Sequence, residues 1–115
     1  MEIKEILNSV VGAVEDKKAH DPVVLDIQGL SVVADYFVIC HGNSELQVQA
    51  IAKEVQDLGH KLGLFSKAME GFDEARWVLV DLGDIVVHIF HREERDYYNL
   101  EKLWADAQRL EVGGV

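Results

Sequence analysis

Two apolar segments, residues 77–82 and 85–90, are separated only by the dipeptide Gly83-Asp84. A Gly-Asp pair between two apolar runs favours a tight turn, and therefore an antiparallel β-hairpin. The turn fixes the register, with Leu82 opposite Ile85. One face of the hairpin then carries only apolar side chains and belongs in a hydrophobic core: Val78, Val80, Leu82, Ile85, Val87 and Ile89.

The opposite face of the predicted hairpin mixes apolar and polar side chains. In the same register it holds three pairs: Trp77 with Phe90, Leu79 with His88, and Asp81 with Val86. Asp81 and His88 would be costly to bury without partners, whereas the aromatic and aliphatic side chains are costly to leave in water. We therefore expect either another part of the chain or a binding partner to cover this face.

The spacing of apolar residues elsewhere predicts an α+β fold, with a mixed β-sheet of about five strands packed with helices. Besides the hairpin, strands are expected at residues 23–27, 35–40 and 64–69. Helices are expected at residues 2–18, at residues 44–62 and after Asn99, where Leu100, Leu103, Trp104 and Ala107 form one stripe. Residues 1–110 are expected to form a single domain, and residues 111–115 a frayed tail.

Four residues mark the ends of these helices. Ser44 and Gln47 have the spacing of a capping box, in which each side chain satisfies a backbone amide of the first turn. Gly63 suits the left-handed residue that ends a helix, and Asn99 suits an N-cap.

The formal net charge of −10 opposes direct binding to nucleic acid, because phosphate contacts need clustered Lys and Arg. It favours basic partners, although a soluble acidic protein without a charged partner has the same composition.

The single cysteine excludes an intrachain disulfide and suits a reducing cytoplasm. The chain shows no signal peptide at its start and no apolar run near the roughly 20 residues of a membrane span, so no membrane association is expected.

Nucleophilic and metal-dependent chemistry find little support in the sequence. Cys40 and His41 are neighbours on a predicted strand and point to opposite faces, so Cys40 is better interpreted as a small buried hydrophobe. His88 and His91 also lie on opposite strand faces, and no cluster of Cys or carboxylates completes a metal site. We therefore expect neither a metal nor a cofactor.

Two further features have competing interpretations. The turn Gly42-Asn43-Ser44 before a helix could hold an anion, but helix capping explains it equally well. Asp81 and Asp84 flank the hairpin turn and could hold a divalent ion, or act as a surface acid and a turn residue. Trp77 is the stronger candidate, because aromatic side chains surrounded by polar groups are typical of interface hot spots.

Several segments occur in an order and spacing that resemble the ribosomal silencing factor family, also called Iojap-like. The resemblance covers about residues 5 to 108 and is carried by Ala34–Ile39, Gly42–Ser44, Gln47–Ala52, Glu70-Gly71, Trp77–Asp81, Gly83-Asp84, Val86–His88 and Tyr98–Trp104. His41 and Asn43 stand where many relatives have small residues such as Ser or Thr.

This resemblance implies a translational repressor rather than an enzyme. Such factors bind the large ribosomal subunit through its ribosomal protein fourteen, block joining of the small subunit and lower translation under nutrient limitation. The family fold resembles a nucleotidyltransferase core, whose catalysis needs paired carboxylates on a strand to hold metal ions. Here Asp81 is followed by Leu82 and Gly83, so the catalytic carboxylates are lacking.

Taken together, residues and resemblance predict a docking surface centred on the second hairpin face. The expected contact residues are Glu70, Trp77, Leu79, Asp81, His88, Tyr98, Leu100 and Trp104. We expect little direct nucleic-acid contact, a cytoplasmic location and a possible homodimer when the protein is free. Two alternatives stay open: a nucleotide-binding protein that uses Gly42, Ser44 and Asp81, and a generic acidic dimerisation module.

Overall fold

The computed structural model describes residues 2–64 and 69–110. Its helices are α1 (Ile3–Asp16), α2 (Glu45–Lys61), α3 (Arg92–Tyr98) and α4 (Leu100–Leu103). Its strands are β1 (His20–Asp26), β2 (Tyr36–Gly42), β3 (Met69–Glu70), β4 (Trp77–Asp81), β5 (Ile85–His91) and β6 (Gln108–Leu110).

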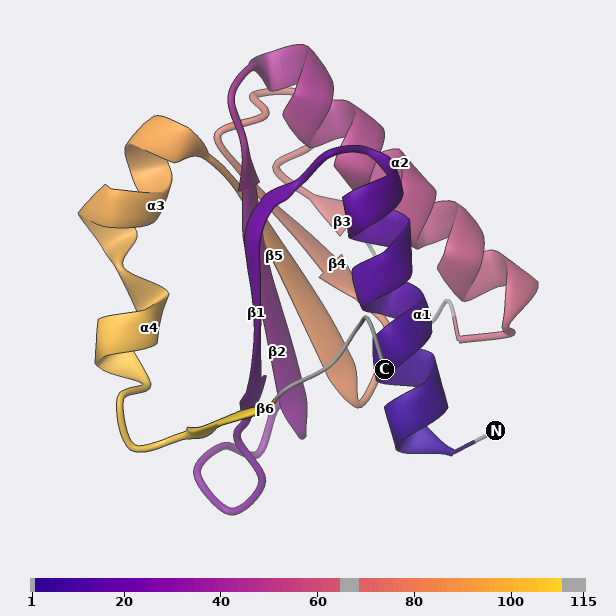
Figure 1. The fold of residues 1–115 in the computed structure, drawn as a ribbon, viewed down its shortest axis with the longest axis vertical. Helices are drawn as coiled ribbons and strands as arrows, with labels where there is room; N and C mark the ends of the chain where they lie inside the picture. The colour runs from indigo at the N-terminus through magenta and orange to yellow at the C-terminus, as the bar shows by residue number, and fades with distance from the viewer. Residues whose placement is uncertain (1, 65–68, 111–115) are drawn as a thin grey trace.

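The six strands form one mixed sheet in the order β3-β4-β5-β2-β1-β6. Among these six strands, β2 and β5 pair in parallel, and the other four pairings are antiparallel. Helices α1 and α2 pack on one face of the sheet, and α3 and α4 lie over the other (Figure 1). The predicted α+β class and mixed sheet are confirmed, with one strand more than the expected number.

The larger core lies between the sheet and the helices α1 and α2. All six residues of the predicted apolar hairpin face belong to it. Helix α1 adds Leu7, Val10, Val11 and Val14, and α2 adds Val48, Ile51, Ala52 and Val55. Both helices bury one stripe at helical spacing, as their sequences predict.

The capping signals around α2 are confirmed with one change. Ser44 Oγ accepts a hydrogen bond of 3.1 Å from the amide of Gln47, and Gly63 has the left-handed φ of 70°. The Gln47 side chain reaches back one residue further than a capping box requires, since its Oε1 accepts from the amide of Asn43 at 2.7 Å. Its Nε2 donates to the carbonyls of Lys17 and Lys18, which ties the end of α1 to the start of α2.

Element boundaries differ from the predictions near the N-terminus and at the sheet edge. Helix α1 ends at Asp16 rather than near residue 18, and β1 starts at His20, three residues before the strand expected at residues 23–27. A bulge between His20 and Val23 accommodates Pro22, which has no amide to donate to the ladder. Of the edge strand expected at residues 64–69, Met69 belongs to β3, and residues 65–68 lie outside the described chain.

The C-terminal prediction was wrong in its secondary structure. Helix α4 ends at Leu103, whose side chain is 73% exposed, so the expected four-residue stripe does not form. The following residues turn back, and β6 pairs with Val24–Asp26 of β1 as the sixth strand. Residues 92–98 form α3, a helix that is not among those expected from the sequence. The frayed tail expected at residues 111–115 lies outside the described residues.

No helix within residues 2–64 and 69–110 combines the length and the apolar character that a bilayer crossing needs.

Candidate functional site

The second hairpin face has the predicted register. Trp77 pairs with Phe90, Leu79 with His88 and Asp81 with Val86. The amide of Leu82 donates to the carbonyl of Ile85 at 2.9 Å, which closes the turn as the Gly-Asp pair predicts. Asp81 contributes to this turn, because its Oδ1 accepts from the amide of Gly83 at 2.8 Å.

Glu70 lies on the same face of the sheet as the hairpin residues. It pairs with Leu79, and Leu79 pairs with His88, so the three side chains form a row across β3, β4 and β5. Directly opposed residues of antiparallel strands point to the same side. The structure therefore brings together the five predicted contact residues of the sheet.

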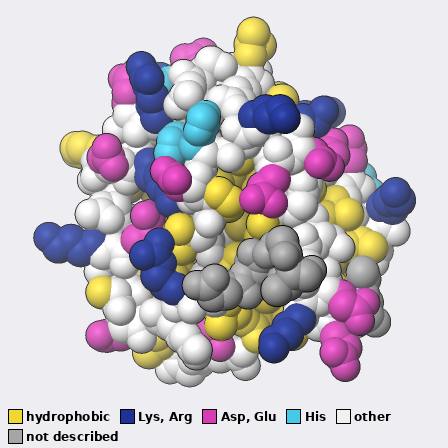
Figure 2. Space-filling view, in the orientation of Figure 1, with side chains coloured by type: hydrophobic (Ala, Val, Ile, Leu, Met, Phe, Trp, Pro, Cys, Tyr) yellow, Lys and Arg dark blue, Asp and Glu magenta, His cyan; other side chains and the backbone are white. Residues whose placement is uncertain are grey.

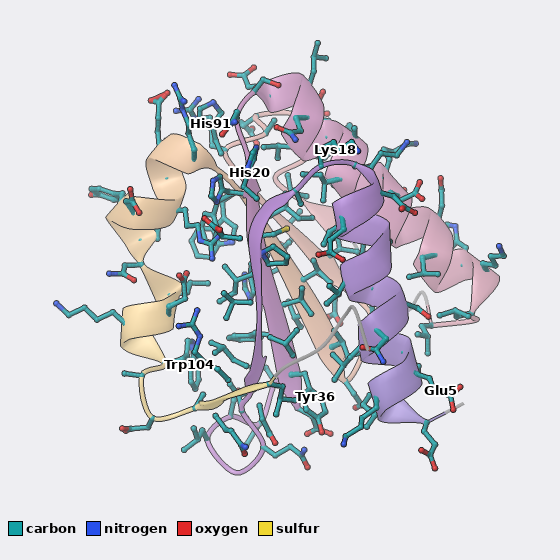
Figure 3. All side chains as sticks on the ribbon, viewed as in Figure 1. Glu5, Lys18, His20, Tyr36, His91 and Trp104 are labelled. Carbon is teal, nitrogen blue, oxygen red and sulfur yellow. The ribbon has the colours of Figure 1, made fainter. Side chains whose placement is uncertain are left out.

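Much of this face is covered by the chain itself. We call residues 92–107 the arm; it comprises α3, α4 and the turn that follows. Leu100 and Ala107 of the arm are buried in a second apolar cluster on this side of the sheet, and Trp104 packs against it. Figure 3 shows Trp104 beside α4, facing the sheet. Its ring meets that of Phe37 edge to face at 5.4 Å between centroids.

Trp77 is the centre of an aromatic group on this face. Its ring stacks on Phe90 at 5.0 Å and lies 4.7 Å from the ring of Tyr98, centroid to centroid. Its Nε1 donates a hydrogen bond of 3.1 Å to Nδ1 of His88. Because one edge of the indole is fixed and the residue stays half-buried, Trp77 presents a rigid apolar surface to solvent.

His88 is nearly buried, with 5% of its surface exposed. Burial lowers its pKa to about 4, so the ring is neutral at physiological pH. Nδ1 accepts the Trp77 hydrogen bond, and the proton therefore resides on Nε2. Within the described residues this buried Nε2 has no hydrogen-bond partner.

The predicted contact residues divide into accessible and buried groups. Glu70 and Tyr98 are exposed, and Trp77, Leu79, Asp81 and Trp104 are half-buried. His88 and Leu100 are buried, with 5% and 7% of their surfaces exposed. The two buried residues therefore support the surface from below, whereas the other six are accessible to a partner.

Sequence reasoning missed the residues that hold the arm in place. Arg95 is 7% exposed and donates through Nη1 to the carbonyl of His20 at 3.2 Å and to Nδ1 of His41 at 2.8 Å. Its Nη2 donates to Glu101 at 3.3 Å. Arg95 thus connects β1, β2 and α4. The high charge of Arg92–Arg95 gave no signal of this burial, because a buried arginine and a solvated one look alike in sequence.

The residues considered for catalysis do not form a reactive group. Cys40 is buried in the larger core, and burial raises the pKa of its thiol to about 12, which confirms its interpretation as a small hydrophobe. Across residues 2–64 and 69–110, no three His, Cys, Asp or Glu side chains converge on a possible metal position.

The residues of the nucleotide-binding alternative lie at opposite ends of the sheet. Gly42 pairs with His91 at the carboxyl end of β5, next to Ser44 at the start of α2. Asp81 lies beside the other end of β5, where Tyr36 pairs with Ile85. His91 and Tyr36 mark these two ends in Figure 3. The structure does not bring Gly42, Ser44 and Asp81 to one site.

Charged side chains of both signs are spread over the face seen in Figure 2, with hydrophobic side chains gathered near its middle. The acidic excess of the chain therefore does not appear as one continuous acidic patch on that side.

Comparison with known proteins agrees with the predicted resemblance. The family model described as "Ribosomal silencing factor during starvation" matches residues 1–115. The ribosomal silencing factor RsfS of Bacillus subtilis is 63% identical over 107 residues, covering 93% of this chain and 91% of that protein. A crystal structure of a Chromobacterium violaceum protein aligns with a TM-score of 0.88 at 37% identity, covering 100% of this chain and 94% of the other.

A more distant relative is the mouse "Mitochondrial assembly of ribosomal large subunit protein 1". It is 31% identical over 101 residues, which cover 85% of this chain and 44% of the mouse protein.

Proposed function

The chain belongs to the ribosomal silencing factor family, and on this premise we propose that it represses translation by binding the large ribosomal subunit through ribosomal protein fourteen. A silencing role at the ribosome is the common function of proteins with this family name. The partner protein and a steric block of subunit joining are the specific content of the proposal. The mouse relative, whose name refers to the large ribosomal subunit, supports the choice of subunit.

The observation that carries the proposal is the half-buried Trp77 with acidic neighbours on the same sheet face. Trp77 and Leu79 are accessible apolar side chains, and Glu70 and Asp81 flank them. An aromatic anchor within a polar rim is the usual arrangement of a protein-interface hot spot. The carboxylates suit a basic protein and would repel the phosphates of ribosomal RNA.

The arm completes this docking surface in the proposal. Tyr98 is 45% exposed and its ring lies next to that of Trp77. Trp104 is half-buried and extends the apolar area along α4. His88 and Leu100 act from below, by holding Trp77 and α4 in position.

In this mechanism repression is steric and needs no catalytic group, metal or cofactor. A factor seated on the subunit interface would occupy surface that the small subunit needs. The protein would act in the cytoplasm, where the subunits meet. In the free state the same apolar surface would pair with a second copy, as a twofold homodimer.

Sedimentation with separated ribosomal subunits tests the proposal. The protein should co-sediment with the large subunit alone and should reduce formation of the joined ribosome when small subunits are added. Sedimentation with neither subunit, or with the small subunit only, would contradict it. A stable dimer that binds no subunit would instead favour the acidic dimerisation module.

A further inference from the structure

The loop that joins β1 to β2 holds apolar side chains in water. We call residues 28–34 the tip loop; it projects from the lower end of the sheet in Figure 1. The exposed fractions are 49% for Leu30, 105% for Val32 and 72% for Val33. Three neighbouring aliphatic side chains this exposed are unusual unless they bind something.

Hydrogen bonds within the tip loop hold its aliphatic side chains in their exposed positions. The amides of Leu30 and Ser31 both donate to the carbonyl of Ile27, at 3.0 and 3.2 Å. The amide of Val33 donates to Ser31 Oγ at 3.1 Å. At the base of the loop, Gln28 Nε2 donates to the hydroxyl of Tyr36 at 2.7 Å. The loop is therefore fixed in a conformation that points its valines outward, which lowers the entropic cost of binding.

Carboxylates surround the base of the tip loop. Asp26 and Asp35 flank it, and the pKa of Tyr36 is raised first by burial and then by these two carboxylates. The hairpin turn adds Asp84, whose carbonyl accepts from the amides of Asp35 and Tyr36 at 2.9 and 3.0 Å. Asp81 belongs to the same turn, because its Oδ1 accepts from the amide of Gly83. In the part of the chain that the structure describes, none of these four carboxylates forms a salt bridge.

The tip loop is continuous with the docking surface. Its last residue, Ala34, is buried in the same apolar cluster that Trp77, Leu79 and Trp104 pack against. A partner that covers Trp77 and Asp81 would therefore reach the tip loop by extending past one end of the sheet.

We propose that the tip loop is a second anchor for the basic protein partner of the docking surface. Val32 and Val33 insert into an apolar patch of that partner, and the four carboxylates meet Lys or Arg side chains around the patch. The acidic rim disfavours RNA and anionic membranes as occupants, because both would be repelled. This inference rests on the proposed function and adds a distinct contact to it.

Binding of purified large subunits, and separately of isolated ribosomal protein fourteen, tests the second anchor. The variant combines Val32→Ser and Val33→Ser, which change only exposed side chains and should leave the fold intact. We expect its affinity for both probes to fall at least about tenfold. The matched control is Leu46→Ser, an 80% exposed residue on α2 at the other end of the molecule, which should bind like the wild type.

A second variant, Asp84→Lys, changes an exposed charge of the rim. It should slow association and make the rate less dependent on salt concentration, because rim charges act mainly on encounter with a partner. Loss of affinity in the double valine variant supports the anchor, and slower association of Asp84→Lys supports the role of its acidic rim.

Three outcomes would overturn the inference while leaving the proposed function in place. One is wild-type affinity of the double valine variant in an assay where Trp77→Ala is weakened. Another is weakened binding to the whole subunit but not to isolated ribosomal protein fourteen, which would assign the loop to a different component. A third is that the free protein is a dimer, and that the double valine variant becomes monomeric but binds the large subunit as the wild type does. Absence of binding by the wild type would instead refute the proposed function itself.

Discussion

Trp77 donates its indole Nε1 hydrogen to Nδ1 of His88 at 3.1 Å, although the two residues are diagonal rather than direct neighbours in the hairpin. The bond links the exposed centre of the docking surface to a buried ring beneath it. It also fixes the histidine tautomer, since Nδ1 must keep its lone pair free to accept. Orientation of the anchor and protonation of the ring are therefore coupled.

Replacing Trp77 by a smaller side chain should weaken partner binding, and Trp77→Ala should weaken it more than Trp77→Phe. Trp77→Ala removes the anchor, and we expect the free energy of large-subunit binding to become less favourable by about 2 kcal/mol or more. Trp77→Phe keeps an aromatic ring beside Phe90 but loses the hydrogen bond to His88, so its loss should be smaller. Equilibrium binding of each variant checks the order. Unchanged affinity of a folded Trp77→Ala protein would exclude this face as the docking site.

Acid should destabilise the protein partly through His88. Its pKa of about 4 in the folded chain lies below the ordinary 6.5, so between these values the unfolded chain binds more protons. The stabilisation is complete above about pH 6.5 and is lost as the pH falls toward 4, by up to about 3 kcal/mol in free energy of unfolding. Denaturant unfolding at a series of pH values measures the slope.

His88→Gln keeps a hydrogen-bond acceptor for Trp77 but cannot titrate. Its free energy of unfolding should therefore fall less steeply with decreasing pH, between about pH 6.5 and 4, than that of the wild type. His41 also has a lowered pKa, caused first by burial and then by Arg95 and His20, and it contributes in the same direction. The protein with His88 and the His88→Gln variant should therefore both carry His41→Gln. Equal slopes in that background would show that His88 is not buried in its neutral form.

The hairpin and the first two helices were predictable because their signals are local. Gly83 and Asp84 set the turn, and alternation on either side sets which residues share a face. That is enough to place Trp77 and His88 on one face of the sheet. The contact of Phe37 with both His88 and Trp104 was not predictable, because it depends on the parallel pairing of β2 with β5.

The arm and strand β6 were mispredicted for a different physical reason. Helix α3 has no apolar stripe, and Arg95 is its only buried residue within the described chain. Strand β6 is three residues long, and its pairing depends on the open edge of β1 rather than on its own sequence. Both elements are determined by tertiary contacts, which periodicity does not report.

Gly71 supports the docking surface through backbone packing. It has a φ of 79°, and an added Cβ would lie 2.2 Å from the carbonyl oxygen of Trp77. Gly71→Ala should lower the free energy of unfolding by about 3 kcal/mol or more, since left-handed strain adds to a clash with backbone. Gly83→Ala is the control, because its φ is 93° but no atom lies within 4 Å, so it should lose only about 1 kcal/mol. Similar losses in the two variants would contradict the close approach at Trp77.

Arg95 should be the main electrostatic support of the arm. Arg95→Met keeps most of the side-chain volume but leaves the carbonyl of His20, the His41 ring and Glu101 without their donor. Removing one partner of a buried charged network typically costs about 3–5 kcal/mol. Glu101 is partly open to water, so we expect a loss of about 2–4 kcal/mol in the free energy of unfolding, measured by denaturant titration.

Arg76→Met is the matched control for the arm. Arg76 also contacts carboxylates, those of Glu93 and Glu94, but in a more solvated position, and its loss should be clearly smaller. Amide hydrogen exchange locates the effect: Arg95→Met should speed exchange in residues 92–107 more than in α2, because the arm loses its link to β1 and β2 while the larger core is untouched. Combining Arg95→Met with Glu101→Gln removes the unpaired carboxylate and should recover part of the stability. Equal stability of the Arg95 and Arg76 variants would mean that apolar packing by Leu100, Trp104 and Ala107 alone holds the arm on the sheet.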